Sequence, residues 1–108
     1  MNESLNYGEE ELKRDMHDIR REEHAFVIID GEEIVAEVTF APVDEQSIVI
    51  DHTFVAEELR GQHVGKELIE RVVQMAREEG KKIVPACPYA EALFKRTPEY
   101  HDIWKKDS

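Results

Sequence analysis

The hydrophobic pattern of the chain changes once, near Gly61, from the two-residue period of strands to the period of a helix. Before this point, every second residue of the run 34–40 is apolar, which places those side chains on one face of a strand. After it, Val64–Glu79 carries apolar residues at helical spacing. The pattern therefore predicts strands first and a long amphipathic helix next.

Three strands joined by two turns are predicted in the first half, and together they form an antiparallel meander. Asp30-Gly31 is the strongest turn signal among them. The predicted strands are residues 24–29, residues 32–40 and Ser47–Val55, with a second turn region at residues 41–46.

The second half predicts a helix, a short buried strand and a second helix. Gly80 ends the first helix, since glycine often stands just past a helix C-terminus. The buried strand covers residues 83–86, and Pro88 begins a helix that runs to about Arg96. We expect the strand–helix–strand unit of residues 47–87 to be a parallel crossover, so that one mixed sheet of about four to six strands forms an α/β (α+β) domain.

Leu12, Met16 and Ile19 are spaced as i, i+4 and i+7, which predicts an amphipathic helix near the N-terminus. The expected organisation is a helical N-terminal extension over residues 1–21 and one domain over residues 22–108. A chain of 108 residues is long enough for one core and too short for two domains.

The charge balance argues against two classes of partner. Acidic residues number 25 and basic residues 14, which gives a net charge of −11. A nucleic-acid binder usually carries a basic patch, and the short basic pairs here are flanked by acids. We therefore expect no nucleic-acid and no membrane partner, whereas a cationic substrate would suit this charge.

Cysteine usage and the N-terminal sequence predict a cytoplasmic protein. Cys87 is the single cysteine, so the chain cannot form an internal disulfide. The N-terminal segment is polar and acidic and lacks the pattern of a signal peptide. The longest apolar run, residues 25–29, is too short to span a bilayer.

The most informative segment covers residues 54–68, where a strand ends, a loop with two glycines follows and the long helix starts. Backbone N–H groups at such a helix start lack partners and can bind a pyrophosphate. Gly65 would let an anion approach the backbone, and Lys66 adds positive charge. On these residues alone, a loop in which Gly61 and Gly65 only shape a turn remains an open interpretation.

Two other phosphate-binding loops do not fit the segment. The glycine spacing and the preceding meander disagree with a dinucleotide-binding fingerprint. A P-loop is excluded because no Gly-Lys-Ser/Thr sequence is present.

Three motifs in order resemble the short stand-alone members of the GNAT acetyltransferase superfamily. The first motif is the strand of residues 51–55, the second is the loop of residues 58–68, and the third is residues 85–90. In the loop, Arg60 and Gly65 fit the family's coenzyme A motif. The closing residues 98–104 also look like that family. The middle glycine of the family's loop is His63 in this chain. The resemblance covers about residues 24–104.

The resemblance implies a reduced GNAT fold and acetyl-coenzyme A as co-substrate, with no metal. Main-chain groups of Phe54 and Val55 would pair with the pantetheine arm, while the parallel strands part to admit the thioester. Arg60 and the loop that follows would hold the pyrophosphate. The implied coenzyme A-binding residues are Phe54, Val55, Arg60, Gly61, Gln62, His63, Val64, Gly65 and Lys66.

Three residues are candidates for catalysis. Cys87 lies just before the second helix, where a helix N-terminus favours a thiolate, and the resemblance makes it a candidate acetyl carrier. A buried structural cysteine and direct transfer from thioester to amine are the alternatives. Tyr89 is the candidate hydroxyl beside the thiolate, with an aromatic ring packed against the sheet as the alternative. His52 is a candidate base or a structural donor. Asp51 and His52 are neighbours on a strand and should point to opposite faces.

The function that the resemblance implies is acetyl-coenzyme A-dependent transfer of an acetyl group to an amine, either a small amine or a protein lysine. The alternative is a coenzyme A-binding, sensor or interaction module that keeps the fold without catalysis. The short chain predicts an open acceptor site. We expect a monomer or a weak homodimer.

Overall fold

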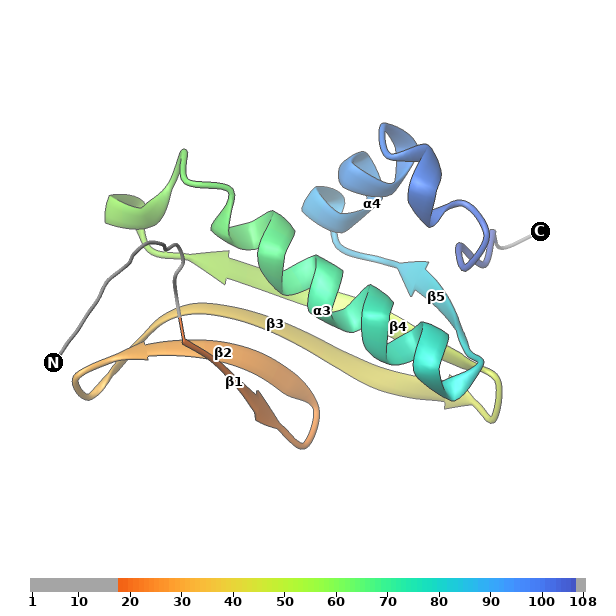
Figure 1. The fold of residues 1–108 in the computed structure, drawn as a ribbon, viewed down its shortest axis with the longest axis horizontal. Helices are drawn as coiled ribbons and strands as arrows, with labels where there is room; N and C mark the ends of the chain where they lie inside the picture. The colour runs from red at the N-terminus through yellow and green to blue at the C-terminus, as the bar shows by residue number, and fades with distance from the viewer. Residues whose placement is uncertain (1–17, 107–108) are drawn as a thin grey trace, which may run out of the picture.

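The structure is a computed structural model, and it describes residues 18–106. Five strands form one sheet, with a long helix lying across it and a shorter helix beside the last strand (Figure 1). The strands are β1 (Ile19–Glu22), β2 (Ala25–Asp30), β3 (Glu33–Asp44), β4 (Ser47–Val55) and β5 (Lys82–Pro85). The helices are α3 (Val64–Glu79) and α4 (Pro88–Lys95), with 3₁₀ turns η1 (Glu57–Leu59) and η2 (Pro98–Tyr100).

The sheet confirms the predicted fold class, a meander followed by a crossover. Its strand order is β1-β2-β3-β4-β5. The first four strands pair antiparallel, and β5 pairs parallel with β4 after the chain has crossed through α3. Helix α3 begins and ends where its apolar period predicts, and Gly80 closes it at a φ of 67°.

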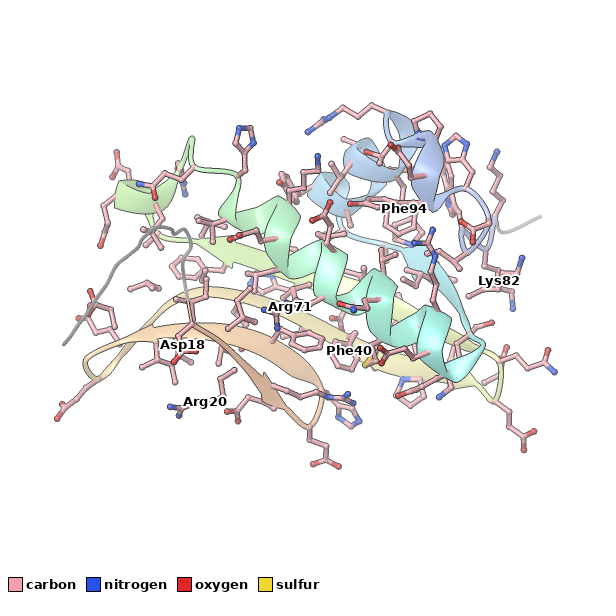
Figure 2. The ribbon with its side chains drawn as sticks, viewed as in Figure 1. Asp18, Arg20, Phe40, Arg71, Lys82 and Phe94 are labelled. Carbon is pink, nitrogen blue, oxygen red and sulfur yellow. The ribbon has the colours of Figure 1, made fainter. Side chains whose placement is uncertain are left out.

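The core lies between α3, α4 and the sheet. The apolar face of α3 is buried against β2, β3 and β4, and Phe40 of β3 lies in the layer between that helix and the sheet (Figure 2). Phe94 of α4 is fully buried and packs against Tyr100 and Trp104, with ring centroids 5.1 and 5.9 Å apart. One continuous core therefore joins both helices to the sheet.

The C-terminal segment covers the outer edge of β5. The Ile83 N–H donates to the Ile103 carbonyl at 2.7 Å, and the Lys105 N–H donates to the Ile83 carbonyl at 2.8 Å. Trp104 forms the corresponding bridge with Ile83. Strand β5 is consequently paired on both sides and held in place at the edge of the core.

Two sequence-based predictions of local structure differ in part from the structure. The helix expected over residues 1–21 falls mostly outside the described residues, but Ile19–Glu22 is a strand that pairs with β2. Arg21 places its guanidinium over the rings of Phe26 and Phe40, which holds this edge strand on the sheet. The turn expected at residues 41–46 is shorter, because β3 continues to Asp44.

Within residues 18–106, neither helix combines the length and the apolar character needed to cross a lipid bilayer.

We expect Phe94→Ala to lower the free energy of unfolding by about 3–5 kcal/mol, because it leaves a cavity where α4 meets the C-terminal rings. Lys95→Ala, at the exposed neighbouring position, should change it by less than about 0.5 kcal/mol. Urea unfolding followed by circular dichroism measures both. Equal midpoints for the two variants would contradict this account of the core.

Candidate active site

Strands β4 and β5 part after Ile50. Their parallel pairing ends at Ile50 and Pro85, and the Ile50 carbonyl then accepts from two N–H groups, those of Ala86 at 2.9 Å and Cys87 at 3.2 Å. Strand β4 continues to Val55 while paired with β3. Beyond Ile50, the β5-facing edge of β4 therefore has no strand beside it within the described residues.

A cleft of about 420 Å³ opens where β4 has parted from β5 and α3 begins. Most of the residues predicted to bind coenzyme A line it. Gln62 and Lys66 do not, while Tyr89, predicted to be catalytic, does. Thr53 and Leu59 line it without having been predicted. The lining residues are Thr53, Phe54, Val55, Leu59, Arg60, Gly61, His63, Val64, Gly65 and Tyr89.

The start of α3 faces this cleft without a capping side chain. The first helical bond of α3 runs from the Glu67 N–H to the His63 carbonyl at 3.1 Å. The N–H groups of Val64, Gly65 and Lys66 precede it and so have no carbonyl partner within the helix. The N-cap residue His63 makes no side-chain capping bond. This end of α3 has the donors and the dipole that bind an anion.

The loop before α3 contains two residues in the left-handed backbone conformation. Gly61 has a φ of 86°, and His63 has a φ of 62°. Within residues 18–106, His63 is the only residue other than glycine with a positive φ. The left-handed conformation is costly for a residue with a Cβ, which explains why glycine suits this position of the family's loop.

Gly65 has a structural role that the sequence did not reveal. A Cβ on Gly65 would lie 2.9 Å from the Tyr89 hydroxyl oxygen and 3.0 Å from two carbon atoms of the same ring. Gly65 therefore makes room for Tyr89, which brings the start of α4 against the start of α3. Close approach of an anion to Gly65 stays a prediction.

The polar side chains of the loop partly fold back on the protein. Arg60 donates from Nε to the Val55 carbonyl at 3.2 Å, so an anion would meet the two terminal nitrogens of its guanidinium. Gln62 donates from Nε2 to the Glu58 carbonyl at 3.4 Å. Lys66 lies along a separate depression between α3 and η2, which Arg96 also lines.

Cys87 is the N-cap residue of α4, and the residue is 7% exposed. The Ala90 N–H donates to its Sγ at 3.4 Å. The Thr53 hydroxyl lies 3.7 Å from the same sulfur. Cys87 does not line the cleft itself, but its sulfur contacts Thr53, which lines the cleft.

Tyr89 lies in the first turn of α4 and remains 39% exposed at the cleft. Burial of part of the ring raises the pKa of Tyr89 above its usual 10.0; the nearby Arg96 charge opposes this shift, and Cys87 adds to it. The phenol is therefore protonated at neutral pH and is able to donate a proton or a hydrogen bond.

The expectation that Asp51 and His52 point to opposite faces was wrong. The register of β3 and β4 pairs Thr39 with His52 and Phe40 with Ile50, so Asp51 is an inserted residue. The Asp51 carboxylate accepts a 2.5 Å hydrogen bond from the Thr39 hydroxyl. Since paired residues share a face, both Asp51 and His52 flank Thr39.

The same register places Thr53 and His52 on opposite faces of β4. Thr53 pairs with Val38, which is fully buried in the core beneath α3. His52 is exposed on the other face, away from Cys87. The structure thus brings Cys87, Thr53 and Tyr89 together and leaves His52 on the far side of the sheet.

Among residues 18–106, no three histidine, cysteine or acidic side chains gather closely enough to hold a metal ion. The expectation that the site uses no metal stays a prediction.

Comparison with known proteins gives consistent results. A family model for the GCN5-related N-acetyl-transferase matches residues 25–103. A GCN5-like protein from Staphylococcus aureus, assigned as an N-acetyltransferase, is 38% identical with a TM-score of 0.73, over 84% of this chain and 90% of that one. No curated protein sequence matches the chain.

Two longer proteins share the fold at lower identity. Ribosomal-protein-alanine N-acetyltransferase from Brucella melitensis biovar Abortus 2308 is 22% identical with a TM-score of 0.54, over 78% of this chain and 64% of that one. A GNAT family acetyltransferase from Elizabethkingia anophelis, with acetyl-CoA bound, is 20% identical with a TM-score of 0.54. The match covers 70% of this chain and 51% of that one.

We expect His63→Gly to be more stable than His63→Ala by about 1 kcal/mol, because both remove the imidazole but only glycine adopts the left-handed conformation without strain. Urea unfolding of the two variants measures the difference. Equal stability, or a more stable alanine variant, would contradict the left-handed conformation of residue 63.

Proposed function

The chain belongs to the GCN5-related N-acetyltransferase family, and from this premise we propose that it binds acetyl-coenzyme A in the cleft between β4 and α3 and transfers the acetyl group to an amine. Membership of the family makes the chain an acetyltransferase enzyme. The observation that carries the proposed binding mode is the uncapped start of α3, which faces a cleft beside the parted strands.

The proposed binding mode uses the backbone more than the side chains. The N–H groups of Val64, Gly65 and Lys66 would hold the pyrophosphate, with the Arg60 guanidinium beside it. The pantetheine arm would lie along Phe54 and Val55, on the edge of β4 that β5 has left. The Elizabethkingia protein, which has acetyl-CoA bound, has the same fold, and this likeness supports the proposal.

The proposed route passes through Cys87. Its thiolate attacks the acetyl carbonyl, a new carbon–sulfur bond forms, and the bond from the carbonyl to the coenzyme A sulfur breaks. The Ala90 N–H and the dipole of α4 stabilise the attacking thiolate. Tyr89 then supplies its proton to the coenzyme A thiolate and regains one from solvent.

The acceptor amine approaches from the face of the sheet opposite α3. The amine attacks acetyl-Cys87 through the opening between the parted strands and expels the thiolate, and its surplus proton passes to solvent. Asp51 and His52 lie on this face beside the parted strands. The carboxylate of Asp51 and the net charge of −11 would attract a cationic amine.

We further propose that the acceptor is a protein lysine or a small amine in an open site. The chain spans 64% and 51% of the length of the Brucella and Elizabethkingia enzymes. Asp51 and His52 are exposed on the face of the sheet opposite α3, and an exposed acceptor site admits a side chain of another protein. A cytoplasmic location, which would give access to such acceptors, stays a prediction.

Intact-mass spectrometry after incubation with acetyl-coenzyme A tests the route. We expect one added acetyl group on the wild-type protein, none on Cys87→Ala, and loss of the group when a lysine-containing peptide or a small diamine is added. The reaction with the wild-type protein should then contain the acetylated amine.

Other outcomes would contradict parts of the proposal. Acetylated amine from both proteins without any adduct would replace the route through Cys87 by direct transfer. Neither adduct nor product, together with a melting temperature raised by coenzyme A, would favour a binding module without catalysis.

Tyr89→Phe should lower the rate of acetyl transfer about a hundredfold at neutral pH, since it removes the proposed proton donor. Tyr100→Phe is the matched control, because the Tyr100 phenol donates to Glu70 at 3.0 Å outside the cleft. Steady-state rates with a thiol-detecting reagent measure both variants. Equal rates for Tyr89→Phe and wild type would remove Tyr89 from the mechanism.

A further inference from the structure

We propose that Thr53 is a catalytic residue whose hydroxyl donates a hydrogen bond to the Cys87 thiolate and so keeps the sulfur reactive at neutral pH. This inference rests on the proposed function, in which Cys87 carries the acetyl group. Thr53 belongs to β4, whereas the sulfur of Cys87 lies at the start of α4.

Two polar groups contact one sulfur atom. The Ala90 N–H can only donate, so Sγ is the acceptor of that 3.4 Å bond. The Thr53 hydroxyl oxygen is 3.7 Å from the same atom, within hydrogen-bond reach for sulfur. A thiolate carries no proton, so it would accept from both groups, and hydrogen bonds to a charged acceptor are roughly twice as strong as neutral ones.

The β-bulge of β4 is what brings Thr53 to this position. Ile48 and Ile50 face the core, and strict alternation would place His52 and Phe54 on that face next. Because Asp51 is inserted, Thr53 and Val55 take the core side instead. Thr53 lines the cleft and also contacts Cys87, so it connects the proposed coenzyme A site to the buried sulfur.

The hydroxyl acts in both half-reactions of the proposed route. It stabilises the thiolate before attack on the acetyl carbonyl. Once the acetyl group is attached, the sulfur is a neutral thioester and a weak acceptor, so the stabilisation is lost. It returns when the amine expels Cys87 as a thiolate. Thr53 exchanges no proton with the reactants, because it donates a hydrogen bond and keeps its own proton.

Titratable groups near Cys87 could also change the pH profile of its alkylation, so the test must separate their effect from that of Thr53. Tyr89 on α4 interacts with it electrostatically, and Arg96 at the end of α4 acts on Tyr89. His52 on β4 lies on the opposite face of the sheet. The test therefore includes Tyr89→Phe, so that a change caused by the phenol is not assigned to Thr53.

The first measurement is the rate of Cys87 alkylation by iodoacetamide between pH 6 and pH 10, without acetyl-coenzyme A. We expect Thr53→Val to move the midpoint of the profile upward by about one pH unit and to slow alkylation about tenfold at pH 7. Thr53→Ser should stay close to wild type because it keeps the hydroxyl. Thr39→Val makes the same substitution on the other face of the sheet and should leave the profile unchanged.

The second measurement is the rate at which acetyl-coenzyme A forms the adduct with Cys87. Thr53→Val should slow it about tenfold at pH 7, and the difference from wild type should shrink as the pH is raised to 9. A defect of the same size at pH 9 would mean that Thr53 shapes the cleft, which overturns the inference. Melting temperatures of all variants verify that each is folded.

The inference and the proposed function fail in different ways. If the alkylation profile of Thr53→Val superimposes on that of wild type, the inference is wrong whether or not Cys87 becomes acetylated. If the profile shifts but the wild-type protein forms no adduct, the hydrogen bond to the thiolate is supported, and the proposed route through Cys87 and the catalytic role of Thr53 are both wrong.

Discussion

The site depends on one backbone atom, the carbonyl oxygen of Ile50. It accepts the last hydrogen bonds between β4 and β5, from Ala86 and Cys87, and beyond it the two strands part. Strand β5 turns directly into α4, while β4 continues along β3 to the loop before α3. The C-terminal segment pairs with the outer side of β5 at Ile83, two residues before β5 leaves β4. The edge of β4 that is left exposed forms a wall of the cleft.

The bulge at Asp51 decides which side chains this edge offers. Without it, His52, which was a candidate base from its residue type, would face Cys87. With it, Thr53 faces the sulfur, and His52 joins Asp51 beside Thr39 on the other face. A bulge inserts one residue without altering the apolar pattern of the strand, so the exchange of faces cannot be recognised from residue types alone.

The sequence predicted those parts of the fold that local patterns determine. Val64–Glu79 and Ser47–Val55 were predicted with the bounds that the structure has, because apolar period, glycine and proline signals coincide there. Ile19–Glu22 was missed because an edge strand held by Arg21 over aromatic rings has no period of its own. The contact between Gly65 and Tyr89 was missed because it joins two helix starts that are distant in sequence.

The two helix starts explain how a chain with a net charge of −11 can hold anions. The start of α3 faces the cleft with uncapped N–H groups, and the start of α4 directs an N–H at the sulfur of Cys87. The packing of Tyr89 on Gly65 keeps the two close together. In the proposed function, α3 stabilises the pyrophosphate and α4 the thiolate, so backbone dipoles supply the positive potential where it is needed. The acidic surface is then left to attract a cationic acceptor, and neither role requires a basic patch.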